Sequence, residues 1–388
     1  MIASHTGFTV ARLDNIAAVF TRDVEAGVIP GAVVLVARGG ETAFFRAFGY
    51  RDRTANAALH TDAIFRGASM TKPLVSVAAM MLAEEGKLQL WEPVATYLPE
   101  FGALRVGPEG VAPIRPMTVQ DLMRHTSGLT LELLGNTPVH AAYRSAGVIN
   151  RAQTNAEMVS KLATLPLLYQ PGTTFEYGMS TDVLARVVEV VSGMEIDAFL
   201  AERICGPLGM RDTAFELPPE KHDRLAEALQ WPSAIEPIIY TPAKPQRWYS
   251  GGGGILTTAQ DYLKFCSMLL GGGALGGTRL LARKTVALMT SDHLPPGCEY
   301  GSFTRTLGIT APLPDHGQGF GLGFFVRTHA GRNPNPGSVG DFGWSGLLGT
   351  YFWVDPAEGL IAILMLQAPE LRVHYRAVLR DLVYAALE

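Results

Sequence analysis

Apolar residues recur at helical spacing near the start of the chain and then give way to strand-like runs. Between residues 9 and 27 they lie three or four positions apart, which predicts a helix that Gly27 ends. These apolar residues are Val10, Leu13, Ile16, Val19 and Phe20. A continuous apolar run over 32–37 follows, and a turn at 39–40 separates it from a second candidate strand, 42–49. We therefore expect one helix and then an antiparallel strand pair.

The middle of the chain, from 91 to about 240, has a different pattern. Strand-like runs are missing, and helical patches alternate with Pro and Gly. These patches are Val119 to His125, Asn155 to Leu165, Thr181 to Ser192 and Ile196 to Arg203. The pattern predicts a mainly helical insertion.

Strand-like runs return in the last third of the chain. Residues 257–270 predict an amphipathic helix whose start is marked by Thr258 and Asp261. Residues 319–327 predict a strand with alternating glycines. A strand hairpin over 351–354 and 360–366 and a closing helix over 370–387 follow.

Strands at both ends of the chain with helices between them predict an α/β protein of the α+β type. We expect one antiparallel sheet flanked by helices and built from both termini. Residues 1–90 and 241–388 would form this α/β domain, and residues 91–240 the inserted, mainly helical domain. A pocket is expected where the two meet, because ligand sites favour domain boundaries.

Composition narrows the function. The chain has 388 residues, of which 47% are hydrophobic and 18% charged, and this predicts a large core. A net charge of −4 without a basic run argues against a nucleic-acid partner. No apolar stretch reaches the roughly 18 residues that span a bilayer, so we expect no membrane partner. The first 15 residues do not resemble a signal peptide, so we expect a cytoplasmic protein. The sequence leaves the oligomeric state open.

Ser69 and Lys72 form the only Ser-x-x-Lys motif in the chain, directly before the apolar run 74–83. If that run is a helix, residues three apart share a face, so both side chains point the same way. A helix N-terminus carries partial positive charge and disfavours an ammonium group. A lysine there is unfavourable for the helix but suits a base for a serine nucleophile.

Other chemistries have weaker support. His125, in Arg124-His125-Thr126-Ser127-Gly128-Leu129, is the best placed histidine for a catalytic base, although a helix-ending histidine bonded to backbone is the commoner case. No Gly-x-Ser-x-Gly and no clustered metal ligands occur, so we expect neither a metal nor another cofactor. The glycines at 251–254 lack a phosphate-binding pattern, and a tight backbone approach beside the site is preferred. The cysteines at 205, 266 and 298 lie in no motif, and we expect free, buried thiols.

A Ser-Lys pair needs a further group, because one lysine cannot easily serve as base, acid and electrostatic anchor. Tyr177 sits just before a predicted helix that begins near Ser180. Its phenol is a candidate for this role, and an ordinary half-buried tyrosine at a loop–helix junction is the plainer alternative.

Four motifs occur in the order seen in serine β-lactamase-like enzymes. They are Ser69-Met70-Thr71-Lys72, Arg124-His125-Thr126-Ser127-Gly128-Leu129, Pro171-Gly172 followed by Tyr177, and Trp344-Ser345-Gly346. The Ser-x-x-Lys motif is shared with penicillin-binding proteins and class A β-lactamases. The details resemble class C β-lactamases and, more nearly, the family VIII carboxylesterases. The resemblance extends over nearly the whole chain and implies a β-lactamase/penicillin-binding-protein-like fold.

The resemblance implies roles for individual residues. Ser69 would be the acylated nucleophile, and Lys72 and Tyr177 would share the base role. The backbone N–H groups of Ser69 and Leu347 would form the oxyanion hole, with Leu347 following Trp344-Ser345-Gly346 on an edge strand. The substrate pocket would be lined by Trp344, Ser345, Gly346 and Met179.

Two departures from the class C pattern point away from lactams. Trp344 stands where class C enzymes carry a lysine that holds the substrate carboxylate, and an aromatic wall suits a neutral group. Met179 replaces the asparagine two residues after the tyrosine. Asp182 is a candidate for compensating Lys72 electrostatically, and an acid in the first turn of a helix is the plainer alternative.

The sequence therefore predicts a serine carboxylesterase acting on small neutral, short-chain esters through an acyl-enzyme. β-Lactamase, D-amino acid amidase or peptidase, and acyltransferase activity are alternatives on the same fold. A non-catalytic penicillin-recognising protein is a further alternative from another class. Trp248 beside the glycine-rich loop is a candidate for lining the pocket, with ordinary packing as the alternative.

Overall fold

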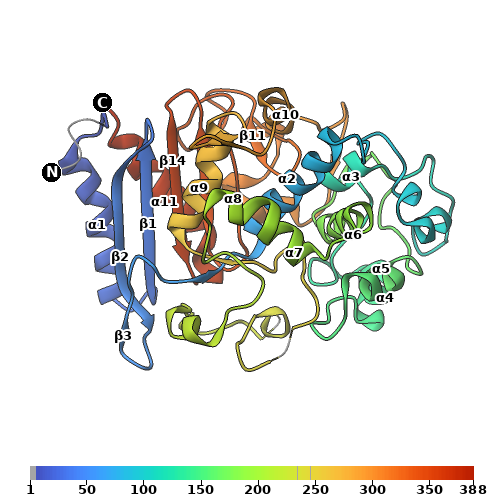
Figure 1. Ribbon diagram of the computed structural model, residues 1–388, viewed down its shortest axis with the longest axis horizontal. Helices are drawn as coiled ribbons and strands as arrows, with labels where there is room; N and C mark the ends of the chain where they lie inside the picture. The colour runs from blue at the N-terminus through green and yellow to red at the C-terminus, as the bar shows by residue number, and fades with distance from the viewer. Residues whose placement is uncertain (1–5, 234, 245) are drawn as a thin grey trace.

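The computed structural model describes residues 6–388 apart from residues 234 and 245. An eight-stranded sheet runs in the order β10-β11-β12-β13-β14-β1-β2-β3, and its neighbouring strands pair antiparallel. Its strands are β10 (Gln318–Phe320), β11 (Phe325–Arg327), β12 (Phe342–Ser345), β13 (Tyr351–Asp355), β14 (Leu360–Leu366), β1 (Gly31–Arg38), β2 (Glu41–Asp52) and β3 (Ala57–Ala58). Figure 1 shows β1, in blue, beside β14, in red. The predicted antiparallel sheet from both ends of the chain is confirmed.

Helices and short strands complete the fold. The helices are α1 (Val10–Glu25), α2 (Thr71–Glu84), α3 (Val119–Met123), α4 (Pro138–Ala146), α5 (Asn155–Leu162), α6 (Ser180–Ser192), α7 (Ile196–Leu200), α8 (Gly206–Leu208), α9 (Ala259–Leu270), α10 (Arg283–Met289) and α11 (Arg372–Ala385). The strands outside the large sheet have two residues each and are β4 (Phe65–Arg66), β5 (Thr174–Phe175), β6 (Leu256–Thr257), β7 (Ala274–Leu275), β8 (Thr278–Arg279) and β9 (Glu299–Tyr300). A 3₁₀ turn, η2 (Ala68–Met70), precedes α2, and a π-helical segment, η5 (Ala201–Cys205), continues α7.

Helices cover both faces of the sheet. Successive residues of a strand point to opposite faces. In β13, Trp353 stacks on Tyr384 of α11, whereas Phe352 packs against Tyr262 of α9. Helix α11, with α1 packed beside it, therefore lies on one face and α9 on the other. The central strands β1 and β14 are buried along almost their whole length, which explains their unbroken apolar runs.

Most predicted elements near the two ends are confirmed within a few residues. The helices expected over 9–27, 257–270 and 370–387 are α1, α9 and α11. Thr258 caps α9, because its side chain accepts a hydrogen bond from the Asp261 backbone N–H. Both predicted hairpins, β1–β2 and β13–β14, form.

The prediction of a single strand over 319–327 is wrong. These residues form β10 and β11, which pair antiparallel with Phe320 opposite Phe325. Gly323 has a φ of +98°, and a Cβ there would lie 2.4 Å from Ser76 Oγ. The chain thus reverses at a position that only glycine fits. The glycines marked a turn between two strands.

The middle of the chain is mainly helical, as expected, and holds α3 to α8. Helix α4 lies outside the predicted helical patches, although it has clear end signals. Thr137 caps its start, Pro138 opens its first turn, and Gly147 ends it with a φ of +58°. The proposed domain limits at 90/91 and 240/241 remain a prediction.

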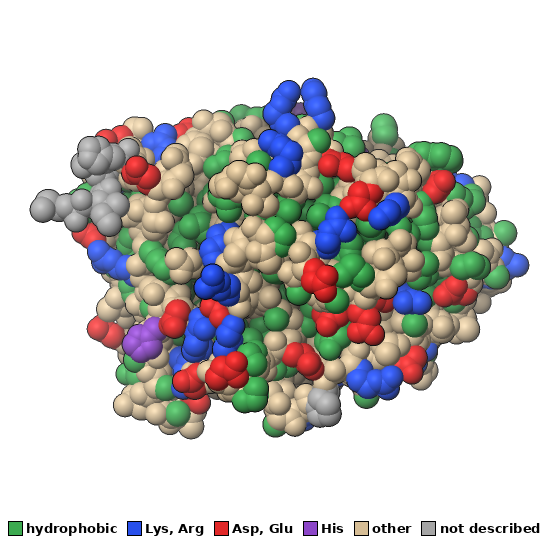
Figure 2. All heavy atoms as spheres, in the orientation of Figure 1, with side chains coloured by type: hydrophobic (Ala, Val, Ile, Leu, Met, Phe, Trp, Pro, Cys, Tyr) green, Lys and Arg blue, Asp and Glu red, His purple; other side chains and the backbone are tan. Residues whose placement is uncertain are grey.

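The surface and the cysteines give few functional signals. Figure 2 shows acidic and basic side chains interspersed across the visible face. Among the residues that the structure describes, no helix is both long and apolar enough to cross a membrane. All three cysteines are free, with Cys205 and Cys266 buried and Cys298 half-buried.

Candidate active site

Ser69 lies in the 3₁₀ turn that leads into α2. Its Oγ lies 3.2 Å from Lys72 Nζ, so the two side chains point the same way, as predicted. Ala68, directly before it, has a φ of +47°, a strained conformation for a residue with a Cβ. Thr71 Oγ1 donates to the Ala68 carbonyl at 2.7 Å and helps to hold this turn.

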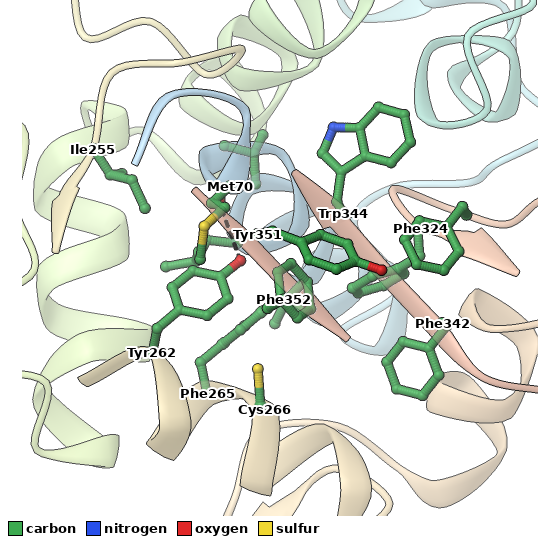
Figure 3. Close-up of a cluster of buried hydrophobic side chains, with 14 of the residues drawn as sticks. Met70, Ile255, Tyr262, Phe265, Cys266, Phe324, Phe342, Trp344, Tyr351 and Phe352 are labelled. Atoms are coloured by element: carbon green, nitrogen blue, oxygen red, sulfur yellow. Dashed lines mark hydrogen bonds between the residues drawn. The ribbon is translucent and has the colours of Figure 1, made fainter. Parts of the chain in front are cut away.

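The turn that contains Ser69 rests on a packed apolar cluster. In Figure 3, Tyr262 reaches from α9 towards Met70. Its hydroxyl donates to the Met70 carbonyl at 2.9 Å. On another side, Thr350 Oγ1 donates to the Gly67 carbonyl at 3.0 Å. The backbone around Ser69 is thus fixed from α9 and from the loop after β12.

Lys72 is buried, and two oxygens hold its side-chain nitrogen. Besides Ser69 Oγ, its Nζ donates to the Gly252 carbonyl at 2.6 Å. It also lies 4.5 Å from the centre of the Tyr177 ring, on the face where a cation is attracted. These contacts direct the amine towards the serine hydroxyl.

Asp182 reaches Lys72 through the backbone of the glycine-rich loop. Its carboxylate accepts from Ser250 Oγ at 2.5 Å and from the Gly252 N–H at 3.0 Å. Burial raises the pKa of Asp182, and the nearby charge of Lys72 opposes that shift. A Cβ on Gly252 would lie 2.3 Å from Asp182 Oδ2, so the backbone approach requires glycine. Asp182 is in the first turn of α6, but it also fixes the residue that holds Lys72.

Tyr177 lies beside the same serine oxygen. Its hydroxyl donates to Ser69 Oγ at 2.6 Å and accepts from Trp344 Nε1 at 3.3 Å. Its ring is mostly buried and packs against His125, Trp344 and Phe303. Ser69 Oγ thus has two proton-carrying groups within reach, one from α2 and one from the loop before α6.

The turn that holds Leu347 closely approaches the turn that contains Ser69. A Cβ on Gly346 would lie 2.6 Å from the Gly67 carbonyl and 3.2 Å from Ala68 Cβ. The Leu347 N–H donates no hydrogen bond within the described residues, and the Ser69 N–H lies in the first turn of its helix, where acceptors are lacking. Both N–H groups are therefore available to a ligand oxygen.

Trp344 does not form the predicted aromatic wall. Its side chain is fully buried, edge-on to Phe320 and behind Tyr177. Of the described residues, those lining the cavity at Ser69 include Met179 and Trp248 but not Trp344, Ser345 or Gly346. Trp344 instead donates its indole N–H to the Tyr177 hydroxyl. Its contact is with a candidate catalytic group and not with a ligand.

The expected edge strand is also corrected. β12 lies inside the sheet, between β11 and β13. Its pairing with β11 covers only Phe342 and Gly343, whereas β13 pairs along all of 342–345. Trp344 and Ser345 therefore leave one side of the strand unpaired, which gives a local edge near Ser69.

His125 takes neither of the roles considered for it. It is buried between the rings of Tyr177, Phe175 and Phe320, with a φ of +58°. Neither ring nitrogen has a hydrogen-bond partner in the part of the chain that the structure describes. Burial, reinforced by the charge of Lys72, lowers the pKa of His125 well below its usual value. The neutral ring packs against Tyr177 and does not contact Ser69 Oγ.

A cavity of about 150 Å³ opens above Ser69, Lys72 and Tyr177. Much of its wall is apolar and comes from segments distant in sequence: Leu131, Leu134, Ile149, Ile238, Ile239, Phe303, Leu347 and Leu348. Sequence reasoning identified only Leu347 among these. Arg66 and Arg151 also line the cavity and were missed. Their guanidinium groups donate to the chain's own acceptors, such as the Tyr240 and Ile238 carbonyls.

Glu176 is the neighbour of Tyr177 in sequence, but its buried side chain contacts Thr130 and not Ser69. It accepts from Thr130 Oγ1 at 2.7 Å, and burial raises its pKa to about 7. The folded protein thus binds this proton more tightly than the unfolded chain. The resulting stability is fully present below about pH 4.5 and is lost as pH rises through about 7.

Glu176→Gln is expected to stabilise the protein at about pH 8 by roughly 3 kcal/mol, because the amide needs no deprotonation in the core. The glutamine can still accept from Thr130. Urea unfolding of wild type and variant at about pH 5 and pH 8 measures the effect. At the lower pH the difference should fall to about 1 kcal/mol or less, and an equal difference at both values would refute the assignment.

Comparisons with known proteins lead to the same interpretation as the geometry of the site. Residues 16–385 match the Beta-lactamase family. Protein Rv1367c of Mycobacterium tuberculosis is 34% identical over 90% of this chain and 88% of its own length. Esterase EstB of Burkholderia gladioli is 32% identical over 97% of this chain and 95% of its own. The structure of EstCE1, described as a hydrolase with promiscuous acyltransferase activity, superposes with a TM-score of 0.81 at 28% identity, covering 96% of this chain and 99% of that one.

Proposed function

The chain belongs to the beta-lactamase family and is a serine hydrolase on that fold, and we propose that it is a carboxylesterase for small neutral, short-chain esters. One observation carries the proposal: Ser69 Oγ lies within hydrogen-bond reach of both Lys72 Nζ and Tyr177 Oη. Its resemblance to Esterase EstB and to the hydrolase EstCE1 supports the reaction class.

In the acylation step, Ser69 Oγ attacks the ester carbonyl carbon. Its proton passes to the pair formed by Lys72 and Tyr177, one of which must be deprotonated at that moment. The carbon–oxygen bond to the alcohol then breaks, and the alcohol leaves with that proton. The acyl group remains on Ser69 as an ester.

The negative charge that develops on the carbonyl oxygen needs fixed donors. The N–H groups of Ser69 and Leu347 fill this role in the proposal, and losing one such donor costs about 100- to 1,000-fold in kcat in other enzymes. In deacylation, a water molecule loses its proton to the same Lys72–Tyr177 pair and attacks the acyl carbon. The serine hydroxyl is regenerated and the acid leaves.

The mostly apolar cavity wall supports a neutral acyl or alcohol group. Residue 344 is tryptophan, so the strand supplies no cation there for the carboxylate of a lactam. The arginines in the cavity wall donate to carbonyl groups of the chain. These features favour a small ester over a charged lactam.

Acyl transfer is the second candidate, because EstCE1 is described as having promiscuous acyltransferase activity. The same acyl-enzyme serves both reactions, and the outcome depends on whether water or an alcohol attacks it. An apolar cavity wall favours an apolar alcohol over water. Transfer is therefore proposed as a side activity of the esterase.

A substrate panel tests the proposal. It comprises short p-nitrophenyl esters, the lactam nitrocefin and a D-amino acid amide, each assayed with and without an added alcohol. We expect the highest kcat/KM with the esters and loss of that activity in Ser69→Ala. Turnover of nitrocefin above that of the esters would overturn the substrate assignment.

Asp182→Ala is expected to lower kcat for a short ester about 10-fold or more with little change in KM, because Gly252 would no longer be fixed and Lys72 would lose its direction. Asp182→Asn, which can still accept a hydrogen bond, should retain more activity. Kinetics of both variants, with melting temperatures, provide the measurement. Equal kcat in wild type and a folded alanine variant would show that Asp182 serves only the helix.

A further inference from the structure

Arg376, on α11, donates a hydrogen bond from Nη2 to the Gly346 carbonyl oxygen. That carbonyl belongs to the same peptide unit as the Leu347 N–H. A trans peptide is planar, with its C=O and N–H pointing in opposite directions, so holding one end sets the direction of the other. We propose that Arg376 is a positioning residue, which holds the Gly346–Leu347 peptide so that its N–H faces the carbonyl oxygen of a substrate at Ser69. This inference rests on the proposed function.

Stability alone does not explain an arginine at this position. Arg376 is 2% exposed, and within the described residues no carboxylate pairs with it and its single hydrogen bond goes to Gly346. Burial lowers its pKa to about 9, and the neighbouring charge of Arg372 adds to that shift. A buried, unpaired cation is unfavourable for folding. Such a residue with its one bond on a candidate active-site peptide is best explained by function.

Arg380, one turn further along α11, shows what a structural arginine looks like in the same helix. It pairs with the buried Asp341 and also donates to the Tyr351 hydroxyl and the Pro336 carbonyl. Its charge therefore faces a carboxylate, which Arg327 shares, and its donors are used. Arg376 differs from it in both respects.

The peptide that Arg376 holds has little freedom. The Gly346 carbonyl also accepts from the Gly349 N–H at 3.1 Å, and the Gly346 N–H donates to the Thr350 carbonyl at 2.8 Å. A Cβ on Gly346 would lie 2.1 Å from Thr350 Oγ1. Arg376 thus acts on a peptide that already sits against the nucleophile turn.

The charge has a second effect on the same donor. A guanidinium at the carbonyl oxygen draws electron density through the amide, so the N–H becomes a stronger donor. Figure 1 shows α11 beside the sheet, outside the helical part of the molecule. Arg376 would thereby strengthen the Leu347 N–H as a donor from the side of the peptide opposite the substrate.

The test compares an oxygen ester with its thionoester, whose sulfur is a weaker hydrogen-bond acceptor and gains less from oxyanion donors. Wild type, Arg376→Met, Arg376→Lys and the matched control Arg372→Gln are assayed for both substrates, with melting temperatures. Arg372 lies one turn earlier on α11 and donates to the Pro369 carbonyl.

For Arg376→Met we expect kcat for the oxygen ester to fall about 10- to 100-fold with KM little changed, and the oxygen-to-sulfur rate ratio to fall by a similar factor. Arg376→Lys should fall between methionine and wild type, and Arg372→Gln should keep the wild-type ratio. A wild-type ratio in folded Arg376→Met overturns the proposal. If that variant does not fold, a wild-type ratio in Arg376→Lys overturns it instead.

Ser69→Ala separates this inference from the function on which it rests. If Ser69→Ala is inactive and Arg376→Met keeps the wild-type ratio, Arg376 alone is misassigned. If Ser69→Ala hydrolyses the oxygen ester as fast as wild type, both the proposed function and the role of Arg376 are wrong.

Discussion

Replacing Ser69 with alanine is expected to lower kcat/KM for a short p-nitrophenyl ester at least about 1,000-fold. The alanine keeps the backbone of the 3₁₀ turn, and with it the Ser69 N–H, but removes the oxygen to which Lys72 and Tyr177 both reach. Only oxyanion binding and substrate positioning would remain. Initial rates of purified wild type and variant measure the loss.

Ser76→Ala is the matched control for this result. Ser76 lies two turns further along α2, is buried outside the cavity lining, and faces Gly323 on the sheet side. Its loss should leave kcat/KM within a few-fold of wild type. Comparable activity in Ser69→Ala and wild type would mean that another residue attacks the ester.

Tyr177→Phe is expected to lower kcat about 100- to 10,000-fold, the range for removing a general acid–base group. The ring and its packing against His125 and Phe303 are kept, so the change isolates the hydroxyl that contacts Ser69 Oγ. Lys72→Met tests the other partner in the same assay. The variant with the larger loss identifies the group that carries more of the proton transfer.

Trp344→Phe gives the graded control for Tyr177. It removes the indole N–H that donates to the Tyr177 hydroxyl, together with part of a buried ring, but it keeps that hydroxyl beside Ser69. The loss should therefore be clearly smaller than that of Tyr177→Phe. Activity of Tyr177→Phe within threefold of wild type would contradict the shared role of Lys72 and Tyr177. Tyr177 would then be a packing residue only.

The local sequence pattern was sufficient to predict much of the fold and the contact between Ser69 and Lys72 in the site. The apolar periods predicted α1, α9, α11 and both hairpins, because each depends on neighbours in sequence. The contact between Ser69 and Lys72 follows from a three-residue spacing on one helix. Such relations are short-range and need no knowledge of the tertiary fold.

The rest of the site depends on long-range packing. Leu347 could be selected only through a family resemblance. Tyr177 was a candidate from its own position, with an ordinary half-buried tyrosine as the plainer alternative, because nothing in its neighbourhood relates it to Ser69. The cavity wall draws on Leu131, Phe303 and Ile238, which no sequence spacing connects. For the same reason, Trp344 was expected in the pocket, whereas the structure buries it behind Tyr177.

Glycine patterns were the hardest to interpret from sequence. An alternating strand fits the sequence spacing of Gly319, Gly321 and Gly323. In the structure, however, the chain reverses tightly at Gly323, which has a positive φ. Gly252, by contrast, fits the expected close backbone approach, and the carboxylate that demands it comes from Asp182 on another helix. The role of each of these glycines therefore depends on the residue that it contacts, and that residue is distant in sequence.

Intact-mass measurement of the protein after rapid acid quench during turnover of a p-nitrophenyl ester tests the central claim most directly. We predict a species heavier by one acyl group, with the group mapped by peptide digestion to the segment that contains Ser69, and no such species in Ser69→Ala. Ester turnover with an acyl group on another residue, or an adduct that persists in Ser69→Ala, would contradict the account.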